Sequence, residues 1–199
     1  MALRAALACI FLALAVAGCA DNENNIAARA SPPVWPAPQG PLELTRKAGL
    51  TPERAEFFKY HVHAHLDVFF NGDPVVVPAG IGIKKRDPAV QSDTTGVGLI
   101  AKCKRPCISP LHTHQTDGVL HTETKTPAPN TLGQFFTEWD VELSRAAVGE
   151  YRDRNTALAI YVDGDAFKGD PTKIELSDGR EIAIVIGSPP DEIPSEFPQ

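Results

Sequence analysis

Short runs of apolar residues, several of them alternating with polar ones, fill the chain between residues 46 and 188. Between these runs stand four turn dipeptides: Asn71-Gly72, Asp117-Gly118, Asp163-Gly164 and Asp178-Gly179. Each dipeptide suits a two-residue hairpin turn in which both central residues have a positive φ. The pattern therefore predicts a mainly β fold, either a hairpin-rich sandwich or a small barrel.

The strands expected on either side of these turns can be read directly from the sequence. They are HVHAHLDVFF with PVVVPAGIGI, LHTH with VLHTET, TALAIYV with the short AF segment, and TKIEL with EIAIVIG. Many of these runs are rich in β-branched and aromatic residues, which are typical of strands.

Two short helices are expected to cover this β structure. Thr51-Pro52 places an N-cap residue before a proline at the first helical position, which predicts a helix through about Lys59. Thr131 and Gln134 have the spacing of a capping box and predict a second helix through about Trp139. Core packing is expected of the large apolar residues that recur at helical spacing in this second helix: Leu132, Phe135, Phe136 and Trp139.

The first residues have the pattern of a secretion signal. Arg4 precedes an apolar stretch, residues 5–17, that is too short to span a bilayer comfortably. The sequence Val16-Ala17-Gly18-Cys19 resembles the lipobox of bacterial lipoproteins, which implies cleavage before Cys19 and lipidation of its thiol. A plain secretory signal that ends nearby is the alternative. Both interpretations predict a protein of the periplasm or cell exterior, and lipidation would anchor it to a membrane.

Composition divides the rest of the chain, which is long enough for one domain of ordinary size. After the predicted signal peptide (residues 1–18), residues 19–45 contain the proline-rich run SPPVWPAPQGP and are expected to form an extended tether. Residues 46–188 are the predicted β domain. Residues 189–199 are again rich in proline and are expected to form a disordered tail.

Charge and cysteine content narrow the function classes. The net charge of -6 argues against nucleic acid as a partner and against docking on anionic membranes. Once the signal peptide is removed and Cys19 is lipidated, Cys103 and Cys107 are the remaining thiols. In an oxidising compartment two cysteines this close are expected to form a disulfide, and a metal-thiolate role is the alternative.

Histidine carries the strongest chemical signal. All six histidines of the chain lie in two clusters: His61, His63 and His65, and then His112, His114 and His121. Side chains two positions apart in a strand lie on the same face, and imidazole is a common ligand of transition metals. The pattern therefore predicts a metal site.

The hairpin turn gives a sharper expectation for the second cluster. If Asp117 and Gly118 are the two central turn residues, His114 lies opposite His121, and His112 lies opposite Glu123. The four ligand side chains then share one face, whereas a slip of one residue would scatter them. The metal is expected to bind this set first, with His61, His63 and His65 completing or supporting the site.

The sequence is consistent with more than one metal and with one or two bound ions. Six histidines and Glu123 exceed the four ligands of a closed tetrahedral zinc site, so we consider an open site, a pair of ions, or histidines that only orient the ligands. Asp67 is a weaker candidate for such an orienting role. Met1 is the only methionine, which disfavours a methionine-rich copper(I) carrier. Imidazole with carboxylate favours zinc or copper(II), with iron(II) as a further candidate.

Several motifs together resemble a group of uncharacterised secreted or membrane-anchored bacterial and archaeal proteins. The matching strings are HVHAHLDVFFNGDPVVVPAGIGI, CISPLHTHQTDGVLHTET and TLGQFF followed two residues later by Trp139. The group has the pattern HxHxHLDVFxNG, then PLHTHD, GxxHxE and TLGQFF, and Gln115 replaces its common aspartate here. The resemblance covers most of residues 60–187 and implies a shared structure and site, but it names no reaction.

Three functions are consistent with these observations. The leading interpretation is a metal-binding lipoprotein that sequesters a metal ion or delivers it to a membrane or periplasmic protein. The second is a metalloenzyme whose open coordination position activates water, with Glu123 as the general base. The third is a structural subunit of a membrane-associated assembly. A carrier should expose most of its ligands, whereas an enzyme should keep three protein ligands and an open position.

Overall fold

The structure, a computed structural model, describes residues 30–198. The predicted signal peptide and Cys19 lie outside the described residues. Within them, the helices are α1 (Pro41–Lys47), α2 (Leu132–Trp139) and the 3-10 helix η1 (Pro171–Lys173). The strands are β1 (Tyr60–Phe70), β2 (Asp73–Val75), β3 (Leu111–His112), β4 (Val119–Thr124), β5 (Leu143–Ser144), β6 (Ala147–Val148), β7 (Tyr151–Arg152), β8 (Leu158–Val162), β9 (Asp165–Ala166) and β10 (Arg180–Ile186).

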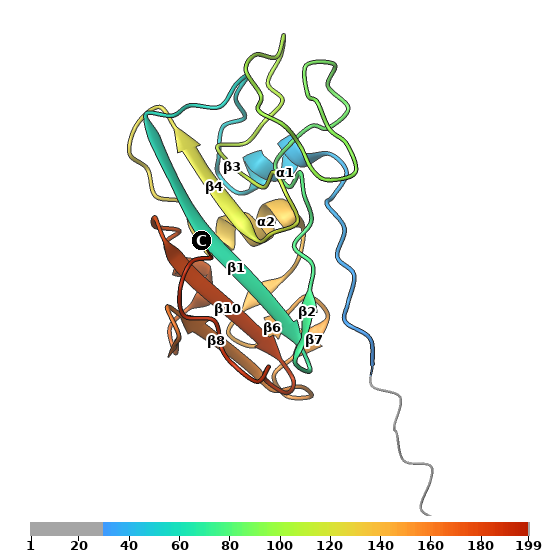
Figure 1. The fold of residues 1–199 in the computed structure, drawn as a ribbon, viewed down its shortest axis with the longest axis vertical. Helices are drawn as coiled ribbons and strands as arrows, with labels where there is room; N and C mark the ends of the chain where they lie inside the picture. The colour runs from blue at the N-terminus through green and yellow to red at the C-terminus, as the bar shows by residue number, and fades with distance from the viewer. Residues whose placement is uncertain (1–29, 199) are drawn as a thin grey trace, which may run out of the picture. The chain divides into compact units, whose positions relative to one another are not determined.

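The predicted mainly β class is confirmed. Seven strands form one sheet in the order β3-β4-β1-β10-β8-β9, and β2 pairs with β1 (Figure 1). The sheet is mixed, because β1 and β10 run parallel whereas its other pairs are antiparallel. A separate small sheet has the order β5-β6-β7. Among the described residues the large sheet remains open and does not form a barrel.

The long strand β1 separates the core from the face that carries histidines. Ala64, Leu66 and Val68 are at most 1% exposed and belong to the main hydrophobic core. Helix α2 contributes to the same core with the apolar residues predicted from its spacing: Leu132, Phe135, Phe136 and Trp139. Burial of these side chains on one side of β1 therefore directs the alternate residues, including the histidines, to the other side.

Two of the four predicted hairpins are confirmed. The turn Asn71-Gly72 joins β1 to β2, and the turn Asp163-Gly164 joins β8 to β9. All four turn residues have a positive φ, between 50° and 85°. Glycine and short polar residues tolerate this conformation better than other types do.

The predicted hairpin at Asp178-Gly179 is wrong. The TKIEL segment does not pair with β10, and Glu175 instead forms an isolated bridge with Thr131. Strand β10 lies between β1 and β8, and every residue from Glu181 to Ile186 is buried. A continuous buried apolar run suits a central strand with a parallel neighbour better than it suits one arm of a surface hairpin.

The hairpin at Asp117-Gly118 has a different register from the predicted one. His112 lies opposite His121, and Leu111 lies opposite Thr122, so the pairing is shifted by two residues. The connection is longer because residues between the strands bond elsewhere: the Thr113 hydroxyl donates to Pro78 O, and the His114 carbonyl accepts from Val97 N. A shift of two residues keeps the same side chains on the same face.

The two helix predictions had opposite outcomes. The capping box of α2 is confirmed, because Gln134 N donates to the Thr131 hydroxyl and Thr131 N donates to the Gln134 side chain. The predicted helix through residues 51–59 is wrong, since Glu53 N donates to Ile108 O and extended pairing replaces helical bonds. The first helix is α1, which begins with a proline.

The ends of the described chain contact the domain. Trp35, in the segment predicted as a tether, packs its ring edge-on against Trp139 at a centroid distance of 5.7 Å. The backbone carbonyl of Trp35 also accepts a hydrogen bond from Trp139 Nε1. Residues 187–198 contain no regular element, and the Phe197 ring lies 6.1 Å from the His65 ring. None of the helices in residues 30–198 has the length and apolarity required to cross a membrane.

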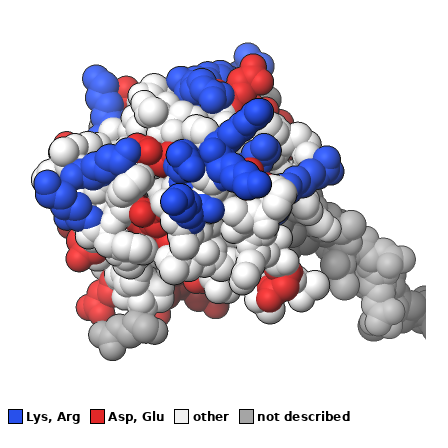
Figure 2. All heavy atoms as spheres, turned by 90° about the horizontal axis from the view of Figure 1, so that it is seen from above, with Lys and Arg blue, Asp and Glu red and all other residues white. Residues whose placement is uncertain are grey.

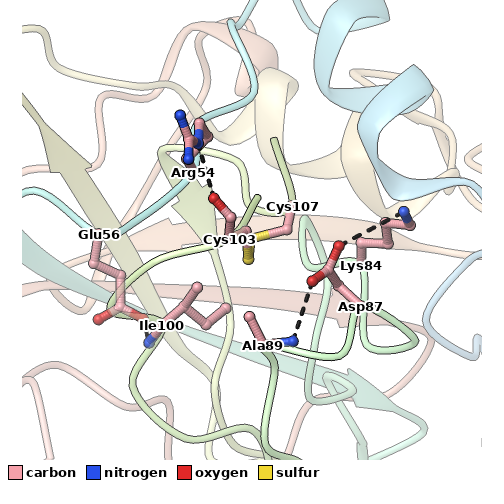
Figure 3. Close-up of a disulfide and its surroundings, with 8 residues drawn as sticks. All are labelled: Arg54, Glu56, Lys84, Asp87, Ala89, Ile100, Cys103 and Cys107. Carbon is pink, nitrogen blue, oxygen red and sulfur yellow. Dashed lines mark hydrogen bonds and ion pairs between the residues drawn. A yellow bond between two sulfur atoms is a disulfide. The ribbon is translucent and has the colours of Figure 1, made fainter. Parts of the chain in front are cut away.

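Residues of the long connection between β2 and β3 form a second, smaller core. It contains the predicted Cys103–Cys107 disulfide, which is present (Figure 3). Both cysteines are fully buried, and the remaining members are Ile83, Val90, Val97, Ile100 and Ile108. Backbone bonds connect this core to the segment before β1: Cys103 N donates to Arg54 O, and Cys107 N donates to Glu53 O.

The connection between β2 and β3 carries many basic side chains, although the whole chain has a net negative charge. Figure 2 looks onto this end of the molecule and shows many Lys and Arg side chains there. The exposed basic residues of the connection between β2 and β3 are Lys84, Lys85, Arg86, Lys102, Lys104 and Arg105. The net charge of -6 is therefore unevenly distributed over the surface.

Candidate metal centre

Three neighbouring strands bring five of the six histidines together. Strands β3, β4 and β1 lie side by side (Figure 1), and His121 on the middle strand is opposite both His112 and His63. His61 is opposite Glu123 one step further along the same pair of strands. His114 lies two residues beyond the end of β3. Because cross-strand partners share a face, these side chains converge.

Backbone carbonyls fix the orientation of two rings. His112 Nδ1 donates to Ser109 O at 2.9 Å, and His114 Nδ1 donates to Val97 O at 2.8 Å. A carbonyl only accepts, so each Nδ1 carries a proton and each neutral ring keeps its lone pair on Nε2. The two Nε2 atoms face each other at 3.1 Å. Histidines that ligate metals commonly have this arrangement, in which a backbone acceptor holds the other ring nitrogen.

A second group of ring nitrogens meets beside the first. His63 Nε2 lies 2.9 Å from His61 Nε2 and 3.1 Å from His121 Nδ1. His121 also belongs to the group formed by His112, His114 and Glu123, whose potential ligand atoms all lie within 4.8 Å of one another. The two groups therefore share His121.

Glu123 lies between the two groups. Its Oε1 is 3.2 Å from His61 Nε2 and 3.6 Å from His121 Nδ1, and its Oε2 is 3.9 Å from His112 Nε2. Its side chain is only 3% exposed, and Oε2 is buried without a hydrogen-bond partner among the described residues. A buried carboxylate oxygen without a partner is costly, and a cation would remove that cost.

Glu56 was not predicted as a site residue, and the structure places it beside His114. Glu56 Oε1 lies 3.4 Å from His114 Nε2. The same carboxylate oxygen accepts from Ile100 N at 2.8 Å (Figure 3). Burial raises the pKa of this carboxyl, and the nearby Glu123 charge adds to the effect. Glu56 does not take part in the alternating pattern of either histidine cluster, so only the pairing of its segment with the disulfide core reveals its role.

The surroundings favour neutral imidazoles. Burial lowers the pKa of His112 well below its usual value, and the neighbouring His114 and His121 lower it further. Burial also lowers the pKa of His63, again with help from two histidines, His121 and His61. Neutral rings keep the lone pair that a metal requires, so the fold suppresses the competing protons.

The structure places His65 apart from the other five histidines. Its Nε2 donates to Asp117 O at 2.7 Å, and its Nδ1 lies 2.8 Å from Glu181 Oε2 and 3.7 Å from Asp67 Oδ2. Burial opposes the charged ring, but the hydrogen bond and charge of Glu181 outweigh it and raise the pKa of His65. His65, Asp67 and Glu181 are close enough to form a third potential cation group.

Exposure differs strongly across the centre. The His112 side chain is fully buried and Glu123 is nearly so, whereas the His61 side chain is 31% exposed. Phe58, itself exposed, lies beside His61 with ring centroids 5.3 Å apart. The centre is therefore closed on the side of β3 and open to solvent at the beginning of β1.

The described cysteines do not contribute to this centre as thiolates, because Cys103 and Cys107 bond to each other. Five of the predicted histidines and Glu123 converge, and His65 joins a different group. The chain was also compared with protein-family models, curated proteins and solved structures, and none of them matches it.

Proposed function

We propose that this protein binds a first-row transition metal, zinc or copper with iron(II) as a further candidate, through His112, His114, His121 and Glu123. The observation that carries the proposal is the 3.1 Å distance between the Nε2 atoms of His112 and His114. Two neutral rings with facing lone pairs repel each other, whereas a cation between them turns the repulsion into two bonds. Tetrahedral zinc with bonds of about 2.0–2.1 Å separates its ligand atoms by roughly 3.3 Å, close to this distance.

The burial of the ligands supports sequestration as the role of the bound ion. His112 and Glu123 are closed off from solvent, so an ion bonded to them cannot leave without movement of the hairpin. Delivery to a membrane or periplasmic protein would then require a partner that opens this side. Nucleic acid is not part of the proposal.

We further propose that the protein works outside the cytoplasm, anchored by lipid at Cys19. The Cys103–Cys107 disulfide supports this location, because disulfides persist mainly in oxidising compartments. The lipobox-like sequence before Cys19 supports the anchor. Labelling with radioactive palmitate in a bacterial host tests it: a Cys19→Ser variant should lose the label, and equal labelling of both proteins contradicts the anchor.

Elemental analysis of the purified chain tests metal binding. The protein, expressed with its signal and then exposed to zinc or copper and dialysed, should retain at least one ion per chain. His114→Ala should retain fewer ions per chain than wild type, whereas Gln115→Ala, an exposed neighbour in the same loop, should retain as many as wild type. A wild-type protein that retains no ion, or a His114→Ala variant that retains as much as wild type, overturns the proposal.

A metalloenzyme is a second candidate, favoured by the exposure of His61. Its side chain is 31% exposed, so water can reach the edge of a centre that is otherwise buried. A metal-bound water there could be activated near neutral pH. Turnover of ester or phosphoester substrates by the metal-loaded protein, absent in His114→Ala, would support the enzyme. Metal retention without turnover across such substrates would support sequestration.

A further inference from the structure

Resting on the proposed metal binding, we infer that the centre holds two ions bridged by the Glu123 carboxylate. The two oxygens of Glu123 are directed toward different histidines: Oε1 toward His61 and His121, and Oε2 toward His112. A carboxylate whose two oxygens meet separate ligand groups is suited to joining two metal ions. We call the two groups the outer site and the inner site.

The outer site consists of His61, His63, His121 and Glu123. The distances between its ligand atoms are 2.9 Å for His61 Nε2 to His63 Nε2 and 3.1 Å for His63 Nε2 to His121 Nδ1. Glu123 Oε1 closes the set at 3.2 Å from His61 Nε2 and 3.6 Å from His121 Nδ1. These values lie close to the roughly 3.3 Å edge of a tetrahedron around zinc.

His121 is close enough to ligate in either group, and we assign it to the outer site because its Nδ1 lies 3.1 Å from His63 Nε2. The inner site then consists of His112, His114 and Glu123, with Glu56 as the fourth ligand. His112 Nε2 and His114 Nε2 are 3.1 Å apart, and Glu56 Oε1 is 3.4 Å from His114 Nε2. Glu123 Oε2 is 3.9 Å from His112 Nε2 and has no hydrogen-bond partner among the described residues. Each of the other three is fixed by backbone: His112 by Ser109 O, His114 by Val97 O, and Glu56 by Ile100 N.

Ligand number and charge both favour two ions over one. One closed tetrahedral site takes four ligands, yet five imidazoles and two carboxylates converge. Neither Glu56 nor Glu123 forms an ion pair with Lys or Arg in residues 30–198. Two buried carboxylates without a cationic partner are costly, and divalent ions on both sides of Glu123 compensate them.

The two sites differ in access and in chemistry. The outer site has three imidazoles and includes the partly exposed His61, which suits an exchangeable zinc or copper(II) ion. The inner site has two imidazoles and two carboxylates, and its His112 and Glu56 side chains are 0% and 2% exposed. The larger share of oxygen ligands suits zinc or a harder divalent ion that is released slowly.

Metal stoichiometry of the full mature chain tests this inference. Equilibrium dialysis of metal-free protein against zinc should give two ions per chain in wild type. His61→Ala should retain one ion by losing the outer site, and Glu56→Gln should retain one by losing the inner site. Glu53→Gln is the matched control, since Glu53 pairs with Lys125 away from the centre and should retain two.

The outcomes separate the two proposals. One ion in wild type, kept in full by His61→Ala or by Glu56→Gln, overturns the two-ion centre and leaves metal binding intact. No ion in wild type overturns the proposed function itself. Folding of each variant is checked by circular dichroism, and His61→Ala provides the decisive comparison if Glu56→Gln does not fold, because His61 is exposed.

Electron paramagnetic resonance of the copper(II)-loaded wild type tests the bridge without any variant. Two copper ions joined by one carboxylate should couple, so the signal of isolated copper should account for well under half of the copper present. His61→Ala with one copper should show the full isolated signal. Two bound ions with full, uncoupled intensity in wild type would overturn the Glu123 bridge.

Discussion

His65 and Glu181 are register partners on the parallel strands β1 and β10, and their side chains meet with 2.8 Å between His65 Nδ1 and Glu181 Oε2. The other ring nitrogen of His65 donates to Asp117 O, in the loop between β3 and β4. The pair thus fastens this loop to the central strands. At Gly118 an added Cβ would approach His65 Nε2 to 2.8 Å, and the φ there is +80°. Glycine is required where the loop passes this closely.

His65→Ala should destabilise the fold and leave the metal centre formed. Removing one partner of a buried ion pair costs about 3 kcal/mol or more, since the remaining carboxylate loses its compensation. Urea unfolding of the metal-free protein should show this loss of unfolding free energy. His61→Ala, at an exposed position of the same strand, should change it by less than about 1 kcal/mol. Equal stability of His65→Ala and wild type would contradict the role of the pair.

In the hairpin that carries the centre, the sequence pattern predicts which face each side chain occupies but not which residues pair. Alternation correctly placed His112, His121 and Glu123 on one face. The turn rule assigned the wrong partners, because the loop makes tertiary bonds to Pro78 and Val97 that override a two-residue turn. The prediction of the face survived because the register shift is an even number of residues.

The remaining errors share a physical cause, which is dependence on distant segments. Glu56 and Glu181 have no local signal, and their roles arise when β10 and the disulfide core come to lie beside β1 and His114. The Thr51-Pro52 helix signal was overridden by pairing of Glu53 with Ile108. Helix α2 was predicted correctly because its capping box is local and its apolar spacing matches the core.

The disulfide should support both stability and metal retention. Val97 and Ile100 belong to the same small core as Cys103 and Cys107, and their backbone groups fix His114 and Glu56. Opening a loop this short lowers the free energy of unfolding by about 2 kcal/mol in the chain-entropy model. The Cys103→Ser/Cys107→Ser protein should show that loss in urea unfolding.

The same variant should bind zinc several-fold more weakly in competition with a chromophoric chelator. The small core fixes His114 and Glu56, but no hydrogen bond within residues 30–198 joins it to His61. We therefore expect the position of His61 to change less than the positions of His114 and Glu56. The comparison protein is wild type that was alkylated without reduction, which keeps its disulfide. Unchanged zinc affinity in the double variant would show that the small core does not position the ligands.

Thr131→Ala should weaken helix α2 by removing its N-cap. The Thr131 hydroxyl accepts from Gln134 N, and loss of such a cap typically costs about 1 kcal/mol. Denaturant unfolding should show a lower midpoint at an unchanged slope. Thr137→Ala on the same helix removes only a bond to Gly133 O and should cost less than about 0.5 kcal/mol. Equal losses in the two variants would argue against the cap.

Glu138 is the buried acid of helix α2, and both of its carboxyl oxygens lack a hydrogen-bond partner among the described residues. Burial raises its pKa from 4.5 to about 8, against the opposing effect of the Ser109 and Thr45 hydroxyls. The carboxyl is therefore protonated in the folded protein at neutral pH and ionised in the unfolded chain. The backbone carbonyl of Ser109 accepts from His112 Nδ1, so Ser109 lies between Glu138 and the metal centre.

Glu138→Gln should remove a pH-dependent loss of stability. Below pH 4.5 the carboxyl is protonated in both states and costs nothing through ionisation. As pH rises from 4.5 to about 8, the folded state keeps a proton that the unfolded state has lost, so the unfolding free energy of wild type falls by about 4 kcal/mol in total. Glutamine does not titrate, and the stability of Glu138→Gln relative to wild type should therefore increase across this range. Urea unfolding of both metal-free proteins at pH 5 and pH 8 measures the difference, in which the titration of other groups cancels. A difference that stays constant between the two pH values would show that Glu138 ionises normally in the folded protein.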